Sequence, residues 1–179
     1  MSLPQRIHFH LGGWPDPKAV QDTLNAHTDH SYGSANELDV CHVGRRVAEG
    51  SNTVWDLGIT AVTDIPFIFR NGVADFDAAT PAHKDGYKAV PYGGINGVSF
   101  QNAMEVNVSG YGEGTVPAVG DLLYSDTDGI LKVATQADGT AVALSKVQIA
   151  VVIKAPYSIG TVKFIRITPL RSFTTSAAV

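Results

Sequence analysis

Short runs in which apolar and polar residues alternate dominate the chain from Ser51 onward. Clear examples lie at residues 55–61 and 104–109, and Gly, Asp, Asn and Pro residues separate the runs. Alternation with a period of two places the apolar side chains on one face of a β-strand. The pattern therefore predicts a mainly β fold, a small antiparallel β-barrel or sandwich, with an N-terminal arm and one short helix.

Dipeptides that favour tight turns divide the apolar runs. Asp128-Gly129 interrupts the segment 119–134 and predicts a hairpin there, and residues 138–139 repeat the Asp-Gly signal. Residues 71–72 (Asn-Gly) predict a turn that closes a strand at 67–69.

Three further segments carry distinct signals. Residues 74–97 are rich in Gly, Pro and Asp and predict a long loop, a type of segment that often contacts partners. Residues 147–153 are apolar on both faces, which predicts a central strand. The strand at 161–168 mixes Lys163 and Arg166 with apolar residues, which predicts an edge position or a β-bulge.

The N-terminal region differs from the rest. Apolar residues at 7, 9 and 11 alternate with histidines at 8 and 10, which predicts an extended arm that adds a strand to a sheet, in its own subunit or a neighbour's. Asp16 as N-cap, Pro17 at the first helical position and an apolar stripe at Val20 and Leu24 predict a short helix from about Pro17 to Asn25. The candidate partner-interface residues are Ile7, Phe9, Leu11 and Trp14.

These patterns divide the 179 residues into three segments. Residues 1–50 form the arm and short helix, residues 51–171 the β-domain with a C-terminal barrel segment at about 104–171, and residues 172–179 a tail. The chain is long enough to bury a substantial core.

Composition narrows the classes of function. Hydrophobic residues make up 44% of the chain and charged residues 17%, against about 25% in a typical soluble domain. A net charge of −4 without a Lys/Arg cluster argues against binding to nucleic acid or to anionic membranes. The single Cys41 and the lack of a long apolar run predict a soluble protein compatible with a reducing compartment.

Candidate chemistry is sparse. His8 and His10 have a spacing that suits two metal ligands, with His30 or His42 as a third, but the polar face of a strand explains them more simply. Cys41 is expected to be a small buried residue. Asx-type turns explain the four aspartates near predicted turns, which are Asp121, Asp126, Asp128 and Asp138. We therefore expect no catalytic, cofactor-binding or metal-binding residues.

Three segments of the C-terminal third, "VGDLLYSDTDGILKVA", "VQIAVVIKAP" and "GTVKFIRITPL", resemble the β-barrel of bacteriophage head decoration (cement) and related virion proteins. The resemblance implies a non-enzymatic structural virion protein that binds the outside of the capsid as a homotrimer and stabilises it. Its partners would be the major capsid protein and itself. It would be made in the host cytoplasm and reside on the capsid surface.

Two alternatives remain open. A phage tail or baseplate β-domain would share the composition and the turns, and would assemble into rings or tubes. A histidine-metal β-barrel enzyme would carry stoichiometric metal in the purified protein.

Overall fold

The computed structural model describes residues 7–9, 21–25, 27, 41–72, 94–99, 105–109, 111–112, 115–140, 142–143, 145–159 and 162–174. In this part of the chain the secondary structure consists of β-strands, and no helix is long and apolar enough to cross a membrane. The strands are β1 (Ile7–Phe9), β2 (Gln21–Asn25), β3 (Val43–Glu49), β4 (Asn52–Leu57), β5 (Phe67–Gly72), β6 (Gly94–Ser99), β7 (Val106–Val108), β8 (Leu122–Ser125), β9 (Leu131–Thr135), β10 (Gln148–Ile159) and β11 (Val162–Thr174).

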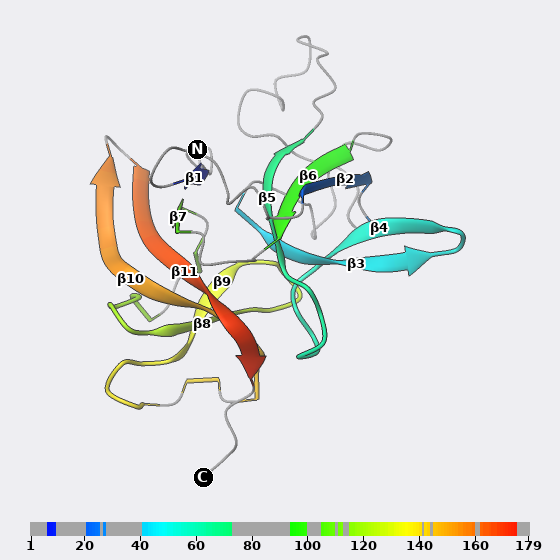
Figure 1. The fold of residues 1–179 in the computed structure, drawn as a ribbon. Helices are drawn as coiled ribbons and strands as arrows, with labels where there is room; N and C mark the ends of the chain where they lie inside the picture. Colours follow the sequence, from blue (N-terminus) through cyan, green and yellow to red (C-terminus); the bar gives the residue numbers. More distant parts are fainter. Residues whose placement is uncertain are drawn as a thin grey trace.

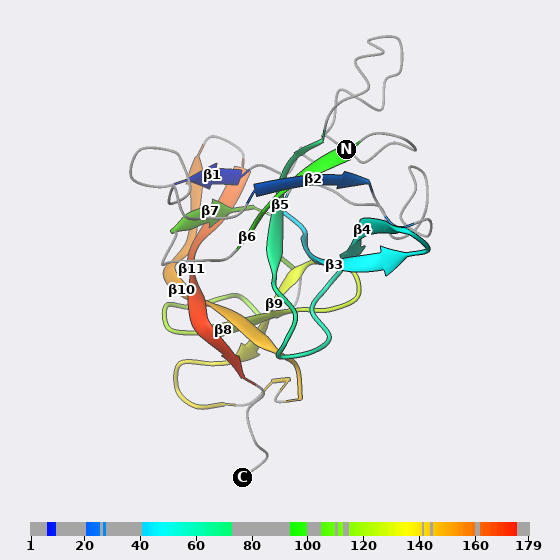
Figure 2. The same cartoon turned by 45° about the vertical axis from the view of Figure 1, so that its right-hand side comes forward.

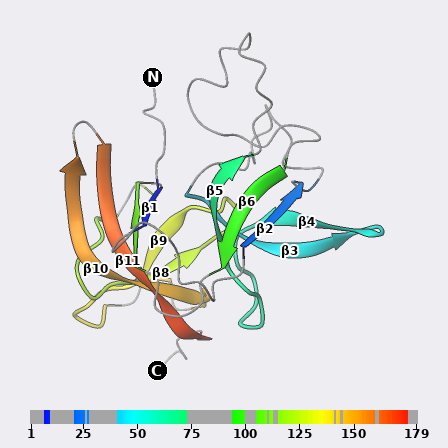
Figure 3. The ribbon, with the colours of Figure 1, turned by 45° about the horizontal axis from the view of Figure 1, so that its top comes forward.

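The strands form two antiparallel sheets that lie side by side (Figure 1). Sheet A has the order β1-β7-β11-β10-β8-β9, and sheet B has the order β2-β6-β5-β3-β4. The long β10–β11 hairpin and the β3–β4 hairpin extend on opposite sides of the molecule (Figure 3). The predicted mainly β, antiparallel fold is confirmed and is sandwich-like, since neither sheet closes into a barrel.

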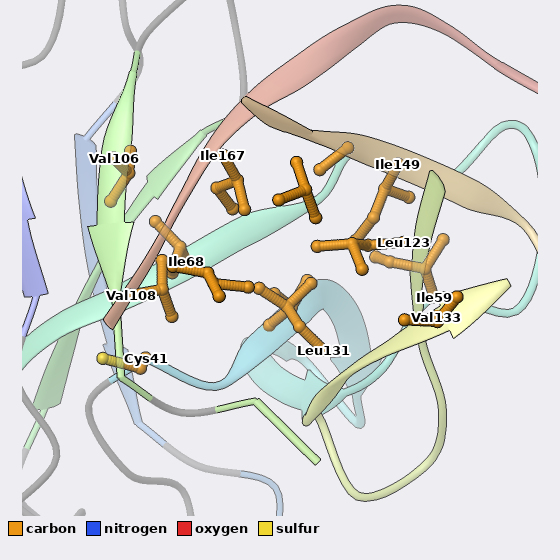
Figure 4. Close-up of a cluster of buried hydrophobic side chains, with 14 of the residues drawn as sticks. Cys41, Ile59, Ile68, Val106, Val108, Leu123, Leu131, Val133, Ile149 and Ile167 are labelled. Carbon is orange, nitrogen blue, oxygen red and sulfur yellow. The ribbon is translucent and has the colours of Figure 1, made fainter. Parts of the chain in front are cut away.

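The main core fills the space between the two sheets. Sheet B contributes Val43, Ile68 and Val98, and sheet A contributes the larger share of the buried aliphatic side chains. Figure 4 shows the labelled side chains of this cluster pointing toward one another from both sheets. Burial of such side chains from water is the main favourable term in folding. The sheet A members include Val106, Val108, Leu123, Leu131, Val133, Ile149, Val152, Ile165 and Ile167.

A second, aromatic core covers the opposite face of sheet B. Trp55 lies against Phe67 and Phe69, with ring centroids 4.8 and 5.4 Å apart and the rings tilted. Leu57 completes the cluster, and the partly buried Leu24 of β2 packs against it. Tilted aromatic pairs at these distances add to the free energy gained by burial alone.

Sheet B curls around this aromatic core. Its two edge strands, β2 and β4, approach each other, and the backbone N–H of His27, just after β2, donates to the carbonyl of Trp55 at 2.7 Å. Two glycines make room inside the curl. A Cβ at Gly97 would lie 2.6 Å from the Trp55 ring, and one at Gly44 would lie 2.6 Å from the Phe69 ring.

The helix predicted from about Pro17 to Asn25 is not confirmed. Gln21–Asn25 form β2, which pairs along its whole length with β6, so the prediction is wrong for these residues. Residues 17–20 lie outside the described residues. An isolated helix of this length is marginal, and pairing with β6 together with packing of Leu24 on the aromatic core stabilises the extended form.

Two predictions about sheet B are also corrected. Asn71 and Gly72 do not form a turn, because β5 continues through them after a register shift and pairs with Asn96 and Ile95. Residues 94–97 of the predicted loop belong to β6, and residues 74–93 lie outside the described part. In both places pairing between distant strands overrides the local preference of Asn and Gly for turns.

In sheet A most predictions are confirmed. Asp128-Gly129 lies in the β8–β9 hairpin connection, where Gly129 has a φ of 72°, and β10 is an inner strand. β11 lies between β7 and β10, so the edge alternative for this strand is wrong, while the bulge alternative is confirmed by its register shifts against β10. Arg166 fits an inner strand because its Nε donates to the Oδ1 of the buried Asn107 directly opposite, at 2.9 Å.

The boundary predicted at residue 50 falls in the turn between β3 and β4. Gly50 has a φ of 60° there, a left-handed conformation that glycine adopts without strain. The two strands pair from Gly44 opposite Leu57 to Glu49 opposite Asn52. The end of the predicted arm region and the start of the predicted β-domain thus form one hairpin.

We predict that Gly97→Ala destabilises the protein by about 2 kcal/mol, within the range of overpacked cores. The added methyl group would collide with the buried Trp55 ring, whose neighbours Phe67 and Phe69 leave it no room to move. Urea denaturation measures the change. Gly112→Ala is the matched control, because its Cβ meets only the flexible side chains of Lys132 and Ile130 at 3.0 Å or more. Equal stability of the two variants would contradict the prediction.

Candidate interaction surface

Two of the four candidate interface residues lie on the outer edge of sheet A. Ile7 pairs with Val108 and Phe9 pairs with Val106, so β1 adds a strand to the sheet of its own chain (Figure 2). This confirms the extended conformation predicted for residues 7–9. Leu11 and Trp14 lie outside the described residues.

The histidines proposed as metal ligands do not come together in the described part. His8 lies in β1 opposite Asn107, and His42 is a partly buried residue next to the fully buried Cys41. His10 and His30 lie outside the described residues. Among the residues that the structure describes, no group of three His, Cys, Asp or Glu side chains is placed to hold a metal ion.

His27 instead connects strands of sheet B. Its backbone N–H reaches the carbonyl of Trp55, and its Nε2 lies 3.7 Å from Glu49 Oε1 at the end of β3. Both side chains are about a third exposed, so the ion pair that forms when His27 is protonated contributes little to stability. The role of His27 in this fold is to join β2 to β4.

Asp121 is a buried carboxylate that ties two loops of sheet A together. It is 2% exposed, and it accepts hydrogen bonds from the N–H groups of Ala118 at 2.8 Å and Ala137 at 2.7 Å. Its backbone carbonyl accepts a hydrogen bond from the N–H of Val152 in β10 at 2.9 Å. Hydrogen bonds to a buried charge are the stronger kind, so Asp121 fixes the approach to β8 against the turn after β9.

The other turn aspartates bond to nearby backbone, as the predicted Asx-type turns require. Asp128 accepts from the N–H of Ile130 at 3.0 Å, and Asp138 accepts from the N–H of Thr140 at 2.8 Å. The bond from Thr140 lowers the pKa of the Asp138 carboxyl. These contacts account for the carboxylates without a bound cation.

A small network of charges surrounds the β8–β9 turn. Lys146 Nζ donates to Asp126 Oδ1 at 3.0 Å, and Lys132 Nζ donates to Asp128 Oδ2 at 2.5 Å. The bonds from Lys146 and from the N–H of Thr127 lower the pKa of Asp126. Burial acts to lower the pKa of Lys132, but the hydrogen bond and the charge of Asp128 outweigh it and raise the pKa.

Arg45 and Asp64 hold the loop that follows β4. The Arg45 guanidinium donates to the carbonyls of Leu57 and Gly58, each at 2.8 Å, and to Asp56 Oδ2 at 2.6 Å. Asp64 accepts from the N–H groups at positions 60 and 61. The Arg45 contacts were not predicted from the sequence, because Asp56, Leu57 and Gly58 become neighbours of Arg45 only when β3 pairs with β4.

Large exposed apolar side chains occur on two loops that these carboxylates hold in place, and at Val142 after β9. Val62 and Ile65 lie on the loop closed by Asp64. Val116 and Val119 lie on the segment anchored by Asp121. Val142 is held by a hydrogen bond from its backbone N–H to the carbonyl of Ala134 on β9. Apolar groups on fixed loops lose little entropy on binding, so they suit a protein contact. We refer to Val116, Val119 and Val142 as the sheet A loop valines.

The sequence matches no protein-family model, and no curated protein resembles it closely enough to indicate a family.

We predict that Asp121→Asn lowers the free energy of unfolding by about 2 kcal/mol, since bonds to a charged group each contribute about 1.5 to 3 kcal/mol. The amide retains one acceptor oxygen, and its NH₂ group would face a backbone N–H that needs an acceptor. Urea denaturation gives the value. The control Asp138→Asn alters a fully exposed turn carboxylate and should cost much less. A larger loss for the control would contradict this role for Asp121.

We predict that Lys146→Gln raises the pKa of Asp126 toward its ordinary value of 3.8. A carboxyl with a lowered pKa in the folded state stabilises the protein above its unfolded pKa, and this contribution is lost as the pH falls through the folded pKa. Because both side chains are about a third or more exposed, the effect on stability should stay under about 1 kcal/mol. NMR titration of the Asp126 carboxyl measures the shift, with Lys163→Gln as the charge-matched control. An unchanged pKa in Lys146→Gln would show that the Thr127 bond and the charge of Lys132 set it without Lys146.

Proposed function

We propose that this chain is a structural virion protein that binds the outer surface of a bacteriophage capsid and stabilises it. It acts as a decoration or cement protein without catalytic activity. The observation that carries the proposal is the resemblance of its C-terminal third to such proteins. That third contributes β8 to β11, which form most of sheet A.

The physical character of the fold supports a structural role. Both faces of sheet B are packed, and carboxylate hydrogen bonds fix the loops at the surface. A protein of this kind stabilises a shell by binding the assembled form and not the separate subunits, because any ligand specific to one state shifts the equilibrium toward it. Rigid loops lower the entropic cost of that contact.

The proposal assigns the contact with the major capsid protein to the sheet A loop valines. The segment at 115–120 carries no charged side chain, and Val116 and Val119 are 71% and 57% exposed. Cores of protein interfaces are depleted of charged residues, so an apolar segment of this kind suits such a contact. The chain would be made in the host cytoplasm and bind as a homotrimer.

We predict that the purified chain co-sediments with empty capsids of the phage that encodes it and raises their melting temperature. Unassembled major capsid protein should not bind it. Val119→Asp should weaken co-sedimentation at least tenfold, because it places a charge in an apolar contact. The control Thr53→Asp adds the same charge to the exposed end of β4 and should bind normally.

The outcomes separate the possible roles. A chain that stays in the supernatant with capsids and instead assembles into rings or tubes is a tail or baseplate protein, and the capsid proposal is wrong. Loss of binding in Thr53→Asp with normal binding in Val119→Asp would move the contact to sheet B. Light scattering on the free chain tests the homotrimer, and a monomer at high concentration would count against it.

A further inference from the structure

β1 is attached to the described part of the structure through one neighbour. Its three residues pair only with β7, where His8 lies opposite Asn107, and β7 is itself a three-residue strand. The other edge of β7 is occupied by β11. A three-residue strand held on one edge belongs to the parts of a protein that open most readily.

The two N-terminal strands belong to different sheets. β1 lies at the edge of sheet A, whereas β2 lies at the edge of sheet B (Figure 2). Residues 10–20 join them, and a chain of that length spans at most about 40 Å when extended. This length is the upper limit on the distance over which β1 can pair with the β7 edge of another copy.

The edge that β1 covers belongs to a buried strand. Val106 and Val108 are fully buried and belong to the main core, and Asn107 is 8% exposed and bonded to Arg166. β7 is thus held by the core through Val106 and Val108 and by β11 on one edge. Such an edge is a preformed template for an antiparallel strand of matching sequence.

We propose that β1 exchanges between copies of this chain, so that Ile7–Phe9 of one copy pair with Val106–Val108 of the next. When β1 of one copy pairs with β7 of the next, the two strands make the same contacts as they make within one chain. The balance between the two arrangements depends on the length of the segment 10–20 and on protein concentration. A ring in which each copy gives its strand to the next closes after a whole number of copies. The exchange deepens the homo-oligomer part of the proposed function and does not depend on capsid binding.

Mixed disulfide formation tests the exchange directly. His8→Cys and Asn107→Cys are made in separate chains, both with Cys41→Ala to remove the native buried thiol. Directly opposite residues of an antiparallel pair have Cβ atoms about 4.5 to 5.5 Å apart, close enough for a disulfide after a small adjustment. Cys41 has a φ of 75°, and alanine carries the same Cβ, so its replacement adds no backbone strain.

After the two chains are mixed and oxidised, we expect a covalent heterodimer on non-reducing gels. The matched control mixes His8→Cys with Ser158→Cys, an exposed position on β10 away from the β7 register. The heterodimer yield should exceed that control at least fivefold and should rise with protein concentration.

A contrary result is equally clear. If His8→Cys and Asn107→Cys in one chain close an internal disulfide, while the mixture gives no more heterodimer than the Ser158→Cys control, β1 stays in its own chain and the exchange is wrong. Capsid binding by the wild-type chain would then leave the proposed function standing.

Asn107→Cys removes the hydrogen bond with Arg166 and could prevent this variant from folding. A second measurement therefore tests the exchange without that substitution. A fluorescent peptide of residues 1–12 is titrated into the full chain, where it competes with the β1 strand already present, and fluorescence anisotropy reports binding. Saturable binding, lost when positions 7, 8 and 9 of the peptide are proline, supports an accepting β7 edge. Absence of binding by the unmodified peptide would overturn the proposal.

Discussion

The alternation of side chains along β5 connects the two cores of this protein. Phe67 and Phe69 point to the aromatic core inside the curl of sheet B, and Ile68, between them, points to the main core against sheet A. A one-residue slip of this strand would exchange the two sets and place bulky rings between the sheets. The register of β5 therefore fixes both the packing of the sheets and the curl that brings β2 to β4.

Buried or half-buried carboxylates extend this order to the loops. Asp121 holds the segment before β8 against the turn after β9, and Asp64 with Arg45 closes the loop after β4. These bonds replace water around backbone N–H groups that would otherwise lack partners. Val116 and Val119 lie on the segment that Asp121 anchors, and Val142 is bonded through its backbone to β9, so these valines are held by the folded body itself.

The sequence predicted the candidate interface only in part. The alternation at residues 7–9 indicated a strand, and the structure places it on β7 of its own chain. The exposed valines and the Arg45 cluster carried no local signal, because exposure and ion pairing depend on which strands become neighbours. The proposed capsid contact concerns exposed valines, and the proposed contact with other copies concerns the β7 edge that β1 covers.

Features that arise from neighbours along the chain could be predicted from the sequence. These are the β class, the Asp128-Gly129 hairpin, the Asx turns and the inner position of β10, whose apolar residues on both faces require cover. Tertiary structure decided where local preference and long-range pairing disagree. Gln21–Asn25 became a strand because pairing with β6 and the packing of Leu24 on the aromatic core outweigh the local helix preference. Asn71-Gly72 extended β5 because pairing with β6 outweighs the local turn preference.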